Sequence, residues 1–383
     1  MIAQVLKIQV LHNGVTVGTL QQDPGTGVCV FEYSQDWLAN GFSLSPTELP
    51  LRPGLFYGNA DRFNGSFALF EDSMPDGYGL YLLERILRKE GSSLKELTPL
   101  QRLSIIGKSG MGALGYIPVM RGFSLHKELA DDEQLDTVQD AALKVLSEAD
   151  TSSAEYLYYN SANSGGARPK AAIRTKDGSH FLVKFRHTYD PEDIGPQELL
   201  YMQTARECGI QVPRIGLVRD KYFAIERFDI AQNGERIHTV TAAALLKTDY
   251  RKQDVDYTNL LALTGFLTQD PAQVEEMFRR MVFNLVCLNK DDHAKNFSFQ
   301  CQKGTWTLAP AYDITYSPQG SNGEHATSLF YDGNPGLDLV LKAGTGIHIP
   351  QTRCLEIIQT VESVCKRNLP RISSLLTAPS TLR

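Results

Sequence analysis

The stretch that decides the fold reads Leu285-Val-Cys-Leu-Asn-Lys-Asp-Asp-His-Ala-Lys-Asn-Phe-Ser-Phe-Gln300. It ends an apolar helical run and then places carboxylates, an imidazole and an amide close together, from Asn289 to Asn296. A further acid, Asp313, follows beyond Lys303-Gly304, and strand-like residues flank that pair on both sides. A hairpin turning at Lys303-Gly304 would carry Asp313 back towards Asn296. We therefore expect these polar side chains to converge.

An acid, an amide five residues later and a second acid after a hairpin follow the order of a kinase active site, in which they serve as base, metal amide and metal acid. Asp291 keeps the five-residue step to Asn296, whereas Asp292 does not, so Asp291 is the predicted base. Asn296 and Asp313 are the predicted Mg²⁺ ligands, because magnesium prefers oxygen donors. His293 could contact a transferring phosphate or only the loop backbone. A charged helix end followed by a hairpin is the plainer alternative for this segment.

A second polar segment lies upstream, from Ser164-Gly165-Gly166 to Lys184. Asp177-Gly178 predicts a tight hairpin turn within it. Lys184 stands between Val183 and Phe185 in an otherwise apolar strand, so its side chain should point to the opposite face. A lysine there needs solvent or an anion, and the glycine pair favours a phosphate. A surface lysine on an edge strand is the alternative.

Glu198 lies in a predicted helix over residues 192–209 that ends at Gly209. It could pair with Lys184 and hold the lysine towards phosphate, as the helix glutamate of kinases does. It could equally be exposed.

Gly107-Lys108-Ser109 looks like the end of a phosphate-binding P-loop. That motif needs a glycine five positions before Gly107, where this chain has Arg102, and it should follow a strand. A turn before a strand over residues 113–118 is the better prediction.

The order of elements predicts an α+β chain with two lobes and a cleft between them. Residues 1–70 read as β-rich, with Asn13-Gly14 as a hairpin turn, and short polar stretches near 151–153 and 160–164 read as loops. Glu226 to Asp229 would join the β-rich half to the helical half. Helices are predicted at 80–89, 130–149, 192–209, 259–269, 272–289 and 354–368.

Composition indicates an ordinary globular protein. The chain has 383 residues, 42% of them hydrophobic, and a formal net charge of −6, which argues against binding nucleic acid through its overall field. Six scattered cysteines form no C-x-x-C pair, so a zinc site or disulfide framework is not expected. The first twenty residues lack a signal-peptide core, and no apolar run is long enough to span a membrane. We expect a cytoplasmic protein that makes no membrane contact.

These motifs resemble the HipA family, serine/threonine kinase toxins of bacterial toxin–antitoxin systems. The resemblance covers nearly the whole chain, in order. It is carried by Phe70-Glu-Asp-Ser-Met-Pro-Asp-Gly77, Gly110-Met-Gly-Ala-Leu-Gly115, Ser164-Gly-Gly-Ala-Arg-Pro-Lys170, Val183-Lys-Phe185, Glu226-Arg-Phe-Asp229, Asn289-Lys-Asp-Asp-His-Ala-Lys-Asn-Phe297 and Tyr312-Asp-Ile314.

The resemblance implies a bilobal protein-kinase-like fold in three parts. These are a β-rich N-terminal module (1–120), an N-lobe with the glycine loop and ATP lysine (121–229), and an all-α C-lobe with the catalytic and metal-binding loops (230–383). ATP would bind through Lys184, Gly165, Gly166 and Glu198, with adenine held by backbone around Glu226, Arg227 and Phe228. Asp291 would be the base, and Asn296 and Asp313 would bind Mg²⁺. Family members autophosphorylate a glycine-loop serine, for which this chain offers Ser161 and Ser164.

The resemblance also implies partners. These are a HipB-like helix-turn-helix antitoxin, DNA only through that antitoxin, and a translation-related target such as glutamyl-tRNA synthetase. Two alternatives stay open: a small-molecule or lipid kinase, since the same residues serve any hydroxyl acceptor, and an inactive kinase-like co-repressor that only binds an antitoxin. Intact Lys184, Asp291, Asn296 and Asp313 speak against the second.

Overall fold

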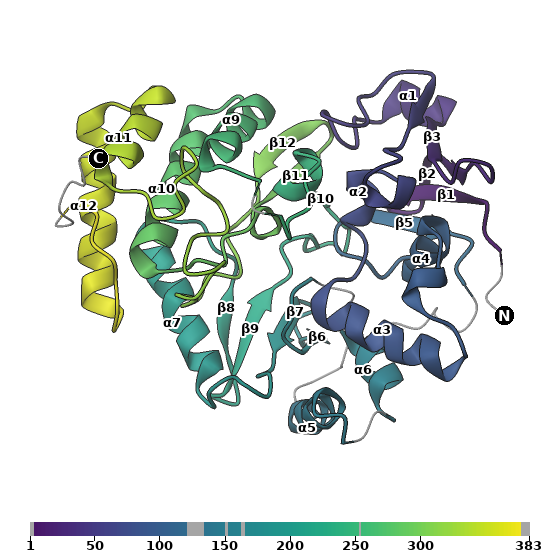
Figure 1. The fold of residues 1–383 in the computed structure, drawn as a ribbon, viewed down its shortest axis with the longest axis horizontal. Helices are drawn as coiled ribbons and strands as arrows, with labels where there is room; N and C mark the ends of the chain where they lie inside the picture. The colour runs from purple at the N-terminus through teal and green to yellow at the C-terminus, as the bar shows by residue number, and fades with distance from the viewer. Residues whose placement is uncertain (1–3, 121–133, 150–151, 162–164, 253, 377–383) are drawn as a thin grey trace. The chain divides into compact units, whose positions relative to one another are not determined.

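A computed structural model of the chain describes residues 4–120, 134–149, 152–161, 165–252 and 254–376 (Figure 1). The chain divides into two compact units. The first unit comprises Met1–Gly195, Gly216–Val240 and Cys301–Gly304, and the second comprises Pro196–Ile215, Thr241–Gln300 and Thr305–Arg383. Each unit is considered by itself. The three-part division at residues 120 and 229 stays a prediction.

The first unit begins with an antiparallel five-stranded sheet in the order β4-β3-β2-β1-β5. Asn13 and Gly14 both have positive φ, 48° and 86°, and form the tight turn between β1 and β2 that their sequence predicts. The β-rich start of the chain is therefore confirmed. The strands are β1 (Lys7–His12), β2 (Val15–Gln22), β3 (Cys29–Tyr33), β4 (Leu55–Tyr57) and β5 (Leu114–Ile117).

Short helices surround this sheet: α1 (Gln35–Asn40), η1 (Phe63–Gly65), α2 (Ala68–Glu71), η2 (Leu94–Glu96) and α4 (Pro99–Ile106). Gly107, at φ 57°, caps the C-terminus of α4. Gly107-Lys108-Ser109 therefore follows a helix end, where carbonyl oxygens face outward and repel phosphate. The turn before β5 is confirmed and the P-loop alternative is excluded.

A second antiparallel sheet of the first unit has the order β6-β7-β9-β8. Gly178 has φ 84°, and the predicted Asp177-Gly178 turn joins β6 to β7. Lys170 pairs with Lys184 and Phe181 with Glu226 in the register of these strands. The strands are β6 (Lys170–Arg174), β7 (His180–Lys184), β8 (Ile215–Val218) and β9 (Tyr222–Glu226).

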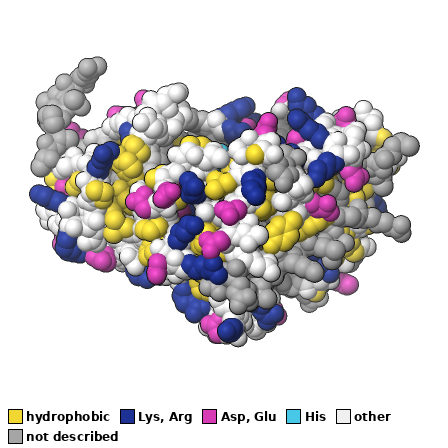
Figure 2. Space-filling model, turned by 90° about the horizontal axis from the view of Figure 1, so that it is seen from below, with side chains coloured by type: hydrophobic (Ala, Val, Ile, Leu, Met, Phe, Trp, Pro, Cys, Tyr) yellow, Lys and Arg dark blue, Asp and Glu magenta, His cyan; other side chains and the backbone are white. Residues whose placement is uncertain are grey.

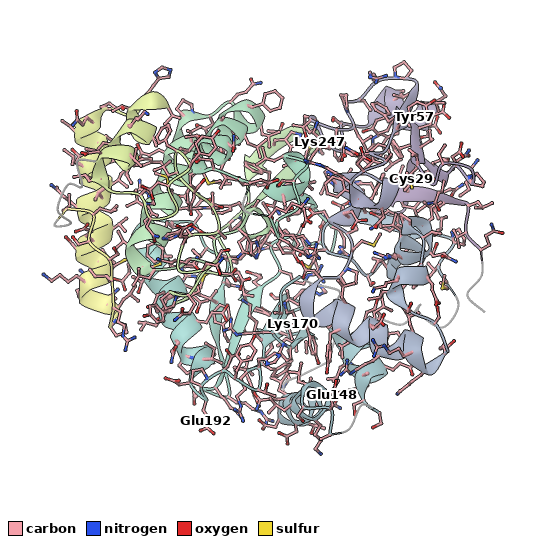
Figure 3. The ribbon with its side chains drawn as sticks, in the orientation of Figure 1. Cys29, Tyr57, Glu148, Lys170, Glu192 and Lys247 are labelled. Carbon is pink, nitrogen blue, oxygen red and sulfur yellow. The ribbon has the colours of Figure 1, made fainter. Side chains whose placement is uncertain are left out.

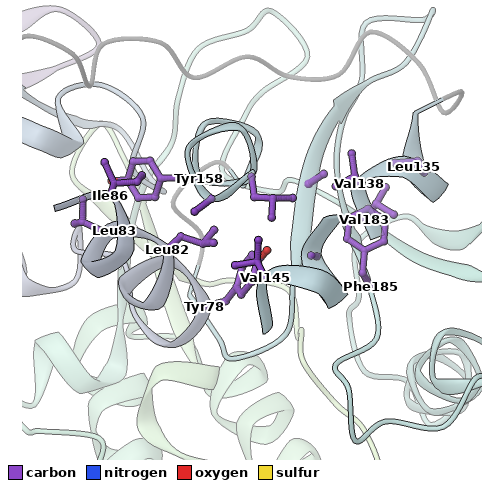
Figure 4. Close-up of a cluster of buried hydrophobic side chains, with 14 of the residues drawn as sticks. Tyr78, Leu82, Leu83, Ile86, Leu135, Val138, Val145, Tyr158, Val183 and Phe185 are labelled. Carbon is purple, nitrogen blue, oxygen red and sulfur yellow. The ribbon is translucent and has the colours of Figure 1, made fainter. Parts of the chain in front are cut away.

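Three helices bury one face of this sheet in a hydrophobic cluster (Figure 4). They are α3 (Gly77–Lys89), α5 (Leu135–Leu146) and α6 (Ala154–Asn160). Val183 and Phe185 are almost completely buried in the cluster, so Lys184 between them points to the other face, as predicted. α6 was not predicted. Residues 130–133 of the predicted 130–149 helix lie outside the described residues.

The second unit contains most of the chain's long helices. Asp256 caps α9 with its carboxylate, and Asp270 followed by Pro271 starts α10. The predicted helices at 192–209, 259–269, 272–289 and 354–368 are confirmed within a few residues. The elements are α7 (Ile194–Glu207), α8 (Ala242–Leu245), α9 (Tyr257–Thr268), α10 (Pro271–Cys287), η3 (Ala294–Asn296), β11 (Ser298–Gln302), β12 (Thr305–Leu308), α11 (Leu337–Gly346) and α12 (Gln351–Asn368). The first two residues of α7, the last two of β11 and all of β10 (His238–Thr241) except Thr241 belong to the first unit. The prediction that residues 230–383 are all-α is wrong, because β10, β11 and β12 form a sheet there.

One face of the molecule carries lysine, arginine and acidic side chains interspersed rather than sorted by sign (Figure 2). This mixture agrees with the small formal net charge of −6. Within the described part of the chain, no helix has both the length and the apolar character needed to cross a bilayer.

Candidate active site

The loop that carries the predicted catalytic residues begins where α10 ends. Leu288 takes a left-handed conformation, φ 58°, and its N–H bonds to the Asn284 carbonyl oxygen to close the helix. The chain then leaves the helix axis as an irregular loop and makes the short helix η3 at Ala294–Asn296. The irregular loop after α10 leaves Asp291 exposed, whereas Asn289 and Asp292 are buried.

Asp291 and Asn296 lie together in this loop. The Asn296 side-chain nitrogen Nδ2 donates to the Asp291 carbonyl oxygen at 2.7 Å, so the five-residue step closes on itself. The Asp291 carboxylate is 63% exposed, and its Oδ1 lies 3.8 Å from His293 Nε2. An exposed carboxylate in a fixed loop can accept a proton from an incoming hydroxyl group.

Asp313 is brought towards the same loop by its neighbour Tyr312. The Tyr312 hydroxyl donates to the Lys295 carbonyl oxygen at 2.6 Å and contacts Ser298 Oγ at 2.5 Å. Tyr312 and Lys295 immediately precede Asp313 and Asn296, so this bond joins the two predicted ligand segments. Asp313 itself has φ 57°, an unusual conformation for a residue other than glycine.

The chemistry of this donor set fits magnesium. Nδ2 of Asn296 is used by the Asp291 carbonyl, which leaves Oδ1 as the amide atom suited to a cation. Asp313 would add a carboxylate. No group of three or more His, Cys, Asp or Glu side chains is arranged for a metal within the described ranges. Mg²⁺ commonly takes one or two carboxylates and keeps several waters.

His293 faces inward. Its Nδ1 is buried and finds no hydrogen-bond partner among the residues that the structure describes. The centres of the His293 and Tyr250 rings are 5.1 Å apart, with the ring planes tilted by 49°. Lys295 Nζ lies 4.9 Å from the centre of the Tyr250 ring. These contacts do not decide between the two predicted roles of His293.

The predicted phosphate-binding residues belong to the first unit. Lys184 is half-buried, with Nζ 5.6 Å from the centre of the Phe223 ring. Lys170 in β6 (Figure 3) is its cross-strand partner and is 7% exposed. Lys170 Nζ donates to the Gly165 carbonyl oxygen. Lys170 therefore contacts the glycine pair, and Lys184 is paired with it across the two strands.

The glycine pair is anchored to α3. The Gly166 N–H donates to Asp76 Oδ1 at 2.5 Å, and the Tyr78 N–H donates to the Gly166 carbonyl oxygen at 3.1 Å. Asp76 occupies the N-cap position of α3, yet its side chain does not cap that helix. Gly166 has φ 95°, which favours glycine at this point.

Sequence reasoning missed both Lys170 and Asp76. The sequence placed both residues inside family-like motifs and gave neither a role. A lysine four residues after Gly166 was the available signal for Lys170. No local signal for Asp76 exists, because its partner lies 90 residues away.

Glu226 is the last residue of β9, and Arg227 and Phe228 follow that strand. The Arg227 guanidinium binds the Asp229 carboxylate through Nε at 3.0 Å and Nη2 at 2.6 Å, and both residues are buried. Burial alone would raise the pKa of Asp229, but the charge and hydrogen bonds of Arg227 outweigh it and lower that pKa. The Arg227 side chain is therefore occupied, and adenine contact through this segment remains a prediction for the backbone.

The remaining predicted site residues are Glu198, Ser161 and Ser164, and two of them are buried. Glu198 is 2% exposed, in α7, so its predicted exposed alternative is excluded. Ser161 is equally buried, and its Oγ donates to the Tyr158 carbonyl oxygen at 2.9 Å. Ser164 lies outside the described residues.

Comparisons with known proteins agree with these observations. Residues 8–117 match the HipA N-terminal domain, and residues 162–368, more than half of the chain, match the HipA-like C-terminal domain. The serine/threonine-protein kinase toxin HipA of Shewanella oneidensis is 23% identical over 350 residues, which span 82% of this chain and 75% of that protein. A putative kinase of Haemophilus influenzae is 29% identical over 179 residues, 40% of this chain and 52% of that protein.

A solved structure of the Shewanella oneidensis MR-1 toxin–antitoxin complex of HipA, HipB and operator DNA superposes with a TM-score of 0.68. The aligned part is 20% identical and covers 96% of this chain and 92% of that one. This likeness shows that the α+β fold is the HipA kinase-like fold. With both domains matched in order, the chain belongs to the HipA family.

Proposed function

We propose that this chain is an ATP- and Mg²⁺-dependent serine/threonine protein kinase and the toxin of a toxin–antitoxin module. The observation that carries the proposal is the closure of Asn296 onto Asp291, with Tyr312 bound to Lys295 beside them. This arrangement supports the proposal because an exposed carboxylate and an amide share one loop, and the segment that carries a second acid is bonded to that loop, in the order that phosphoryl transfer uses.

Each residue has a role in this proposal. Asp291 accepts the proton of the attacking hydroxyl group, and Asn296 and Asp313 hold magnesium. Bound Mg²⁺ would neutralise charge on the nucleotide phosphates. Lys170 and Lys184 pair directly across two strands, where like charges repel, so an anion on that face would stabilise them. The adjacent glycine pair lets a phosphate approach the backbone closely.

The partners follow from the family and stay proposals. The Shewanella oneidensis relative was solved with HipB and operator DNA, so we infer a HipB-like antitoxin as the partner of this chain. We also infer a translation-related target, such as glutamyl-tRNA synthetase. We further infer that the protein acts in the cytoplasm. All six cysteines are buried free thiols, which suits a reducing compartment. Autophosphorylation would fall on Ser164 rather than on the buried Ser161.

Thermal unfolding with and without nucleotide tests the ATP–Mg²⁺ site. At 100 times its Kd, ATP with Mg²⁺ should stabilise the protein by about 2.7 kcal/mol, which raises Tm by roughly 5–10 °C. Asp313→Ala should lose the part of this shift that depends on Mg²⁺. Asp338→Asn, an exposed acid at the start of α11, is the matched control and should keep it. An unchanged Mg²⁺-dependent shift in Asp313→Ala would remove Asp313 from the metal site.

Expression in a bacterial host tests the toxin role and the substrate class. Wild type should arrest growth and add phosphoserine or phosphothreonine to host proteins, whereas Asp291→Asn should do neither. Phosphorylated lipids or metabolites with an unchanged phosphoproteome would instead identify a small-molecule or lipid kinase. Growth arrest by both forms, without new phosphorylation, would contradict the kinase proposal.

A further inference from the structure

Asp292 differs from its neighbour Asp291 in burial and in hydrogen bonding. Its side chain is 0% exposed, and its carboxylate accepts three hydrogen bonds. Oδ2 accepts from the Tyr257 hydroxyl at 2.5 Å and from His325 Nδ1 at 2.8 Å, and Oδ1 accepts from the Thr327 N–H at 3.3 Å. Thr327 Oγ1 also donates to the Asp292 carbonyl oxygen at 2.5 Å. The residue is thus held through both its side chain and its backbone.

The bonds of Asp292 continue to the backbone of Asp291. Asn284 Nδ2 donates to the Tyr257 hydroxyl at 3.0 Å, and Asn289 Nδ2 donates to Asn284 Oδ1 at 2.9 Å. Ser317 Oγ donates to Asn289 Oδ1 at 3.0 Å and accepts from the Asp291 N–H at 3.1 Å. A connected network therefore starts at the Asp292 carboxylate and returns to the amide of the adjacent residue.

The Tyr257 hydroxyl is a dependable donor in this network. Burial raises the pKa of Tyr257 well above its usual value, and the nearby charge of Asp292 raises it further. The hydroxyl therefore keeps its proton and donates to the carboxylate. A buried carboxylate is costly unless hydrogen-bond donors surround it. Here Tyr257 donates from α9, and His325 and Thr327 donate from the segment after β12. Asn284 in α10 donates in turn to the Tyr257 hydroxyl.

The hydrogen bonds of Asp292 and of the Asp291 N–H set the direction of the Asp291 side chain. Residues 291–293 belong to no helix or strand, so these bonds, rather than regular secondary structure, orient the adjacent side chains. With Asp292 fixed inward and the Asp291 N–H fixed to Ser317, the Asp291 carboxylate is directed outward and is 63% exposed. Directional bonds at low dielectric hold such an orientation more firmly than apolar packing does.

We propose that Asp292, supported by His325 and Tyr257, is a positioning residue that orients the Asp291 carboxylate for proton transfer. The inference rests on the proposed kinase function. It gives a role to Asp292. The five-residue step to Asn296 had assigned a role only to Asp291. A displacement of the base by about 1 Å can cost on the order of 100-fold in rate, so loss of the network should act on kcat.

The test measures kcat and the KM for ATP in a matched pair of variants at His325. His325→Asn keeps an N–H donor near the position of Nδ1, whereas His325→Ala removes it. We expect His325→Ala to lower kcat per folded molecule by roughly 10- to 100-fold with the KM for ATP changed less than about threefold. His325→Asn should recover kcat to within roughly tenfold of wild type. Asp292→Asn should behave like His325→Ala.

The folded fraction of each variant is measured by circular dichroism at the assay temperature, so a loss of fold is not counted as a loss of kcat. An unchanged kcat per folded molecule in His325→Ala would overturn the inference, as would equal kcat losses in His325→Ala and His325→Asn. Failure of the proposed function looks different. In that case wild type transfers no phosphate, or Asp291→Asn transfers as much as wild type, and the positioning role falls with it.

Discussion

The buried ion pair of Asp229 gives the sharpest stability prediction. Its carboxylate is 0% exposed and accepts from two nitrogens of Arg227 and from the Gly112 N–H at 2.9 Å. A second cation, Arg236, lies with Nη2 3.6 Å from Oδ2. Asp229 thereby links the end of β9 to the segment before β5, 117 residues earlier in the chain.

Asp229→Asn keeps the size of the side chain but removes its charge. Arg227 then stays buried but loses the charge of Asp229, and breaking a buried pair in this way costs about 3–5 kcal/mol. For a unit of 150–250 residues each kcal/mol lowers Tm by roughly 2–4 °C, so we expect a drop of roughly 6–20 °C. The Gly112 N–H can still bond to the amide oxygen, which favours the lower half of that range.

Differential scanning calorimetry measures the change in Tm. Asp220→Asn is the matched control: Asp220 is exposed in the turn before β9, at φ 53°, a conformation that asparagine tolerates. The control should change stability by less than about 0.5 kcal/mol. A drop in Tm of less than about 2 °C in Asp229→Asn would refute the reasoning. It would mean that the negative charge of Asp229 is not needed to keep Arg227 buried.

Two further predictions concern His238 and Asp76. Burial lowers the pKa of His238 from 6.5 to about 4. Between pH 6.5 and 4 the imidazole is therefore protonated in the unfolded chain but mostly neutral in the folded chain. The free energy of unfolding should fall by about 3 kcal/mol as the pH drops through this range. His238→Gln, which keeps a donor for the Leu44 carbonyl oxygen, should flatten this slope in urea unfolding at several pH values; an unaltered slope would exclude His238 as its source. Asp76→Ala leaves the Gly166 N–H without its acceptor and loosens the glycine loop, so the KM for ATP should rise about tenfold; an unchanged KM in the folded variant would separate Asp76 from nucleotide binding.

Local features of the sequence predicted the elements that depend on neighbouring residues. Asn13-Gly14 and Asp177-Gly178 specify their turns through backbone conformation alone, and both form. α10 was predicted because its apolar spacing runs for several turns. The five-residue step from Asp291 to Asn296 could be read from the sequence, but the hydrogen bond from the Asn296 amide to the Asp291 carbonyl oxygen was not predicted.

Long-range partners were out of reach. Nothing near Asp76 indicates that its carboxylate bonds to Gly166, and nothing near Asp292 indicates donors at Tyr257 and His325, each more than 30 residues away. α6 was missed because it is short and gains its stability from burying Leu157 and Tyr158 in the cluster with α3. Tertiary packing decided these features.

Transfer of labelled γ-phosphate from ATP to protein tests the central claim most directly. We expect Mg²⁺-dependent labelling by wild type and a loss of roughly 100-fold or more in Asp291→Asn, because a positioned general base contributes about 10²- to 10⁴-fold. Asp338→Asn should label as wild type does. Equal labelling by wild type and Asp291→Asn at matched folded concentration would contradict the assignment of Asp291, Asn296 and Asp313 as a phosphoryl-transfer site.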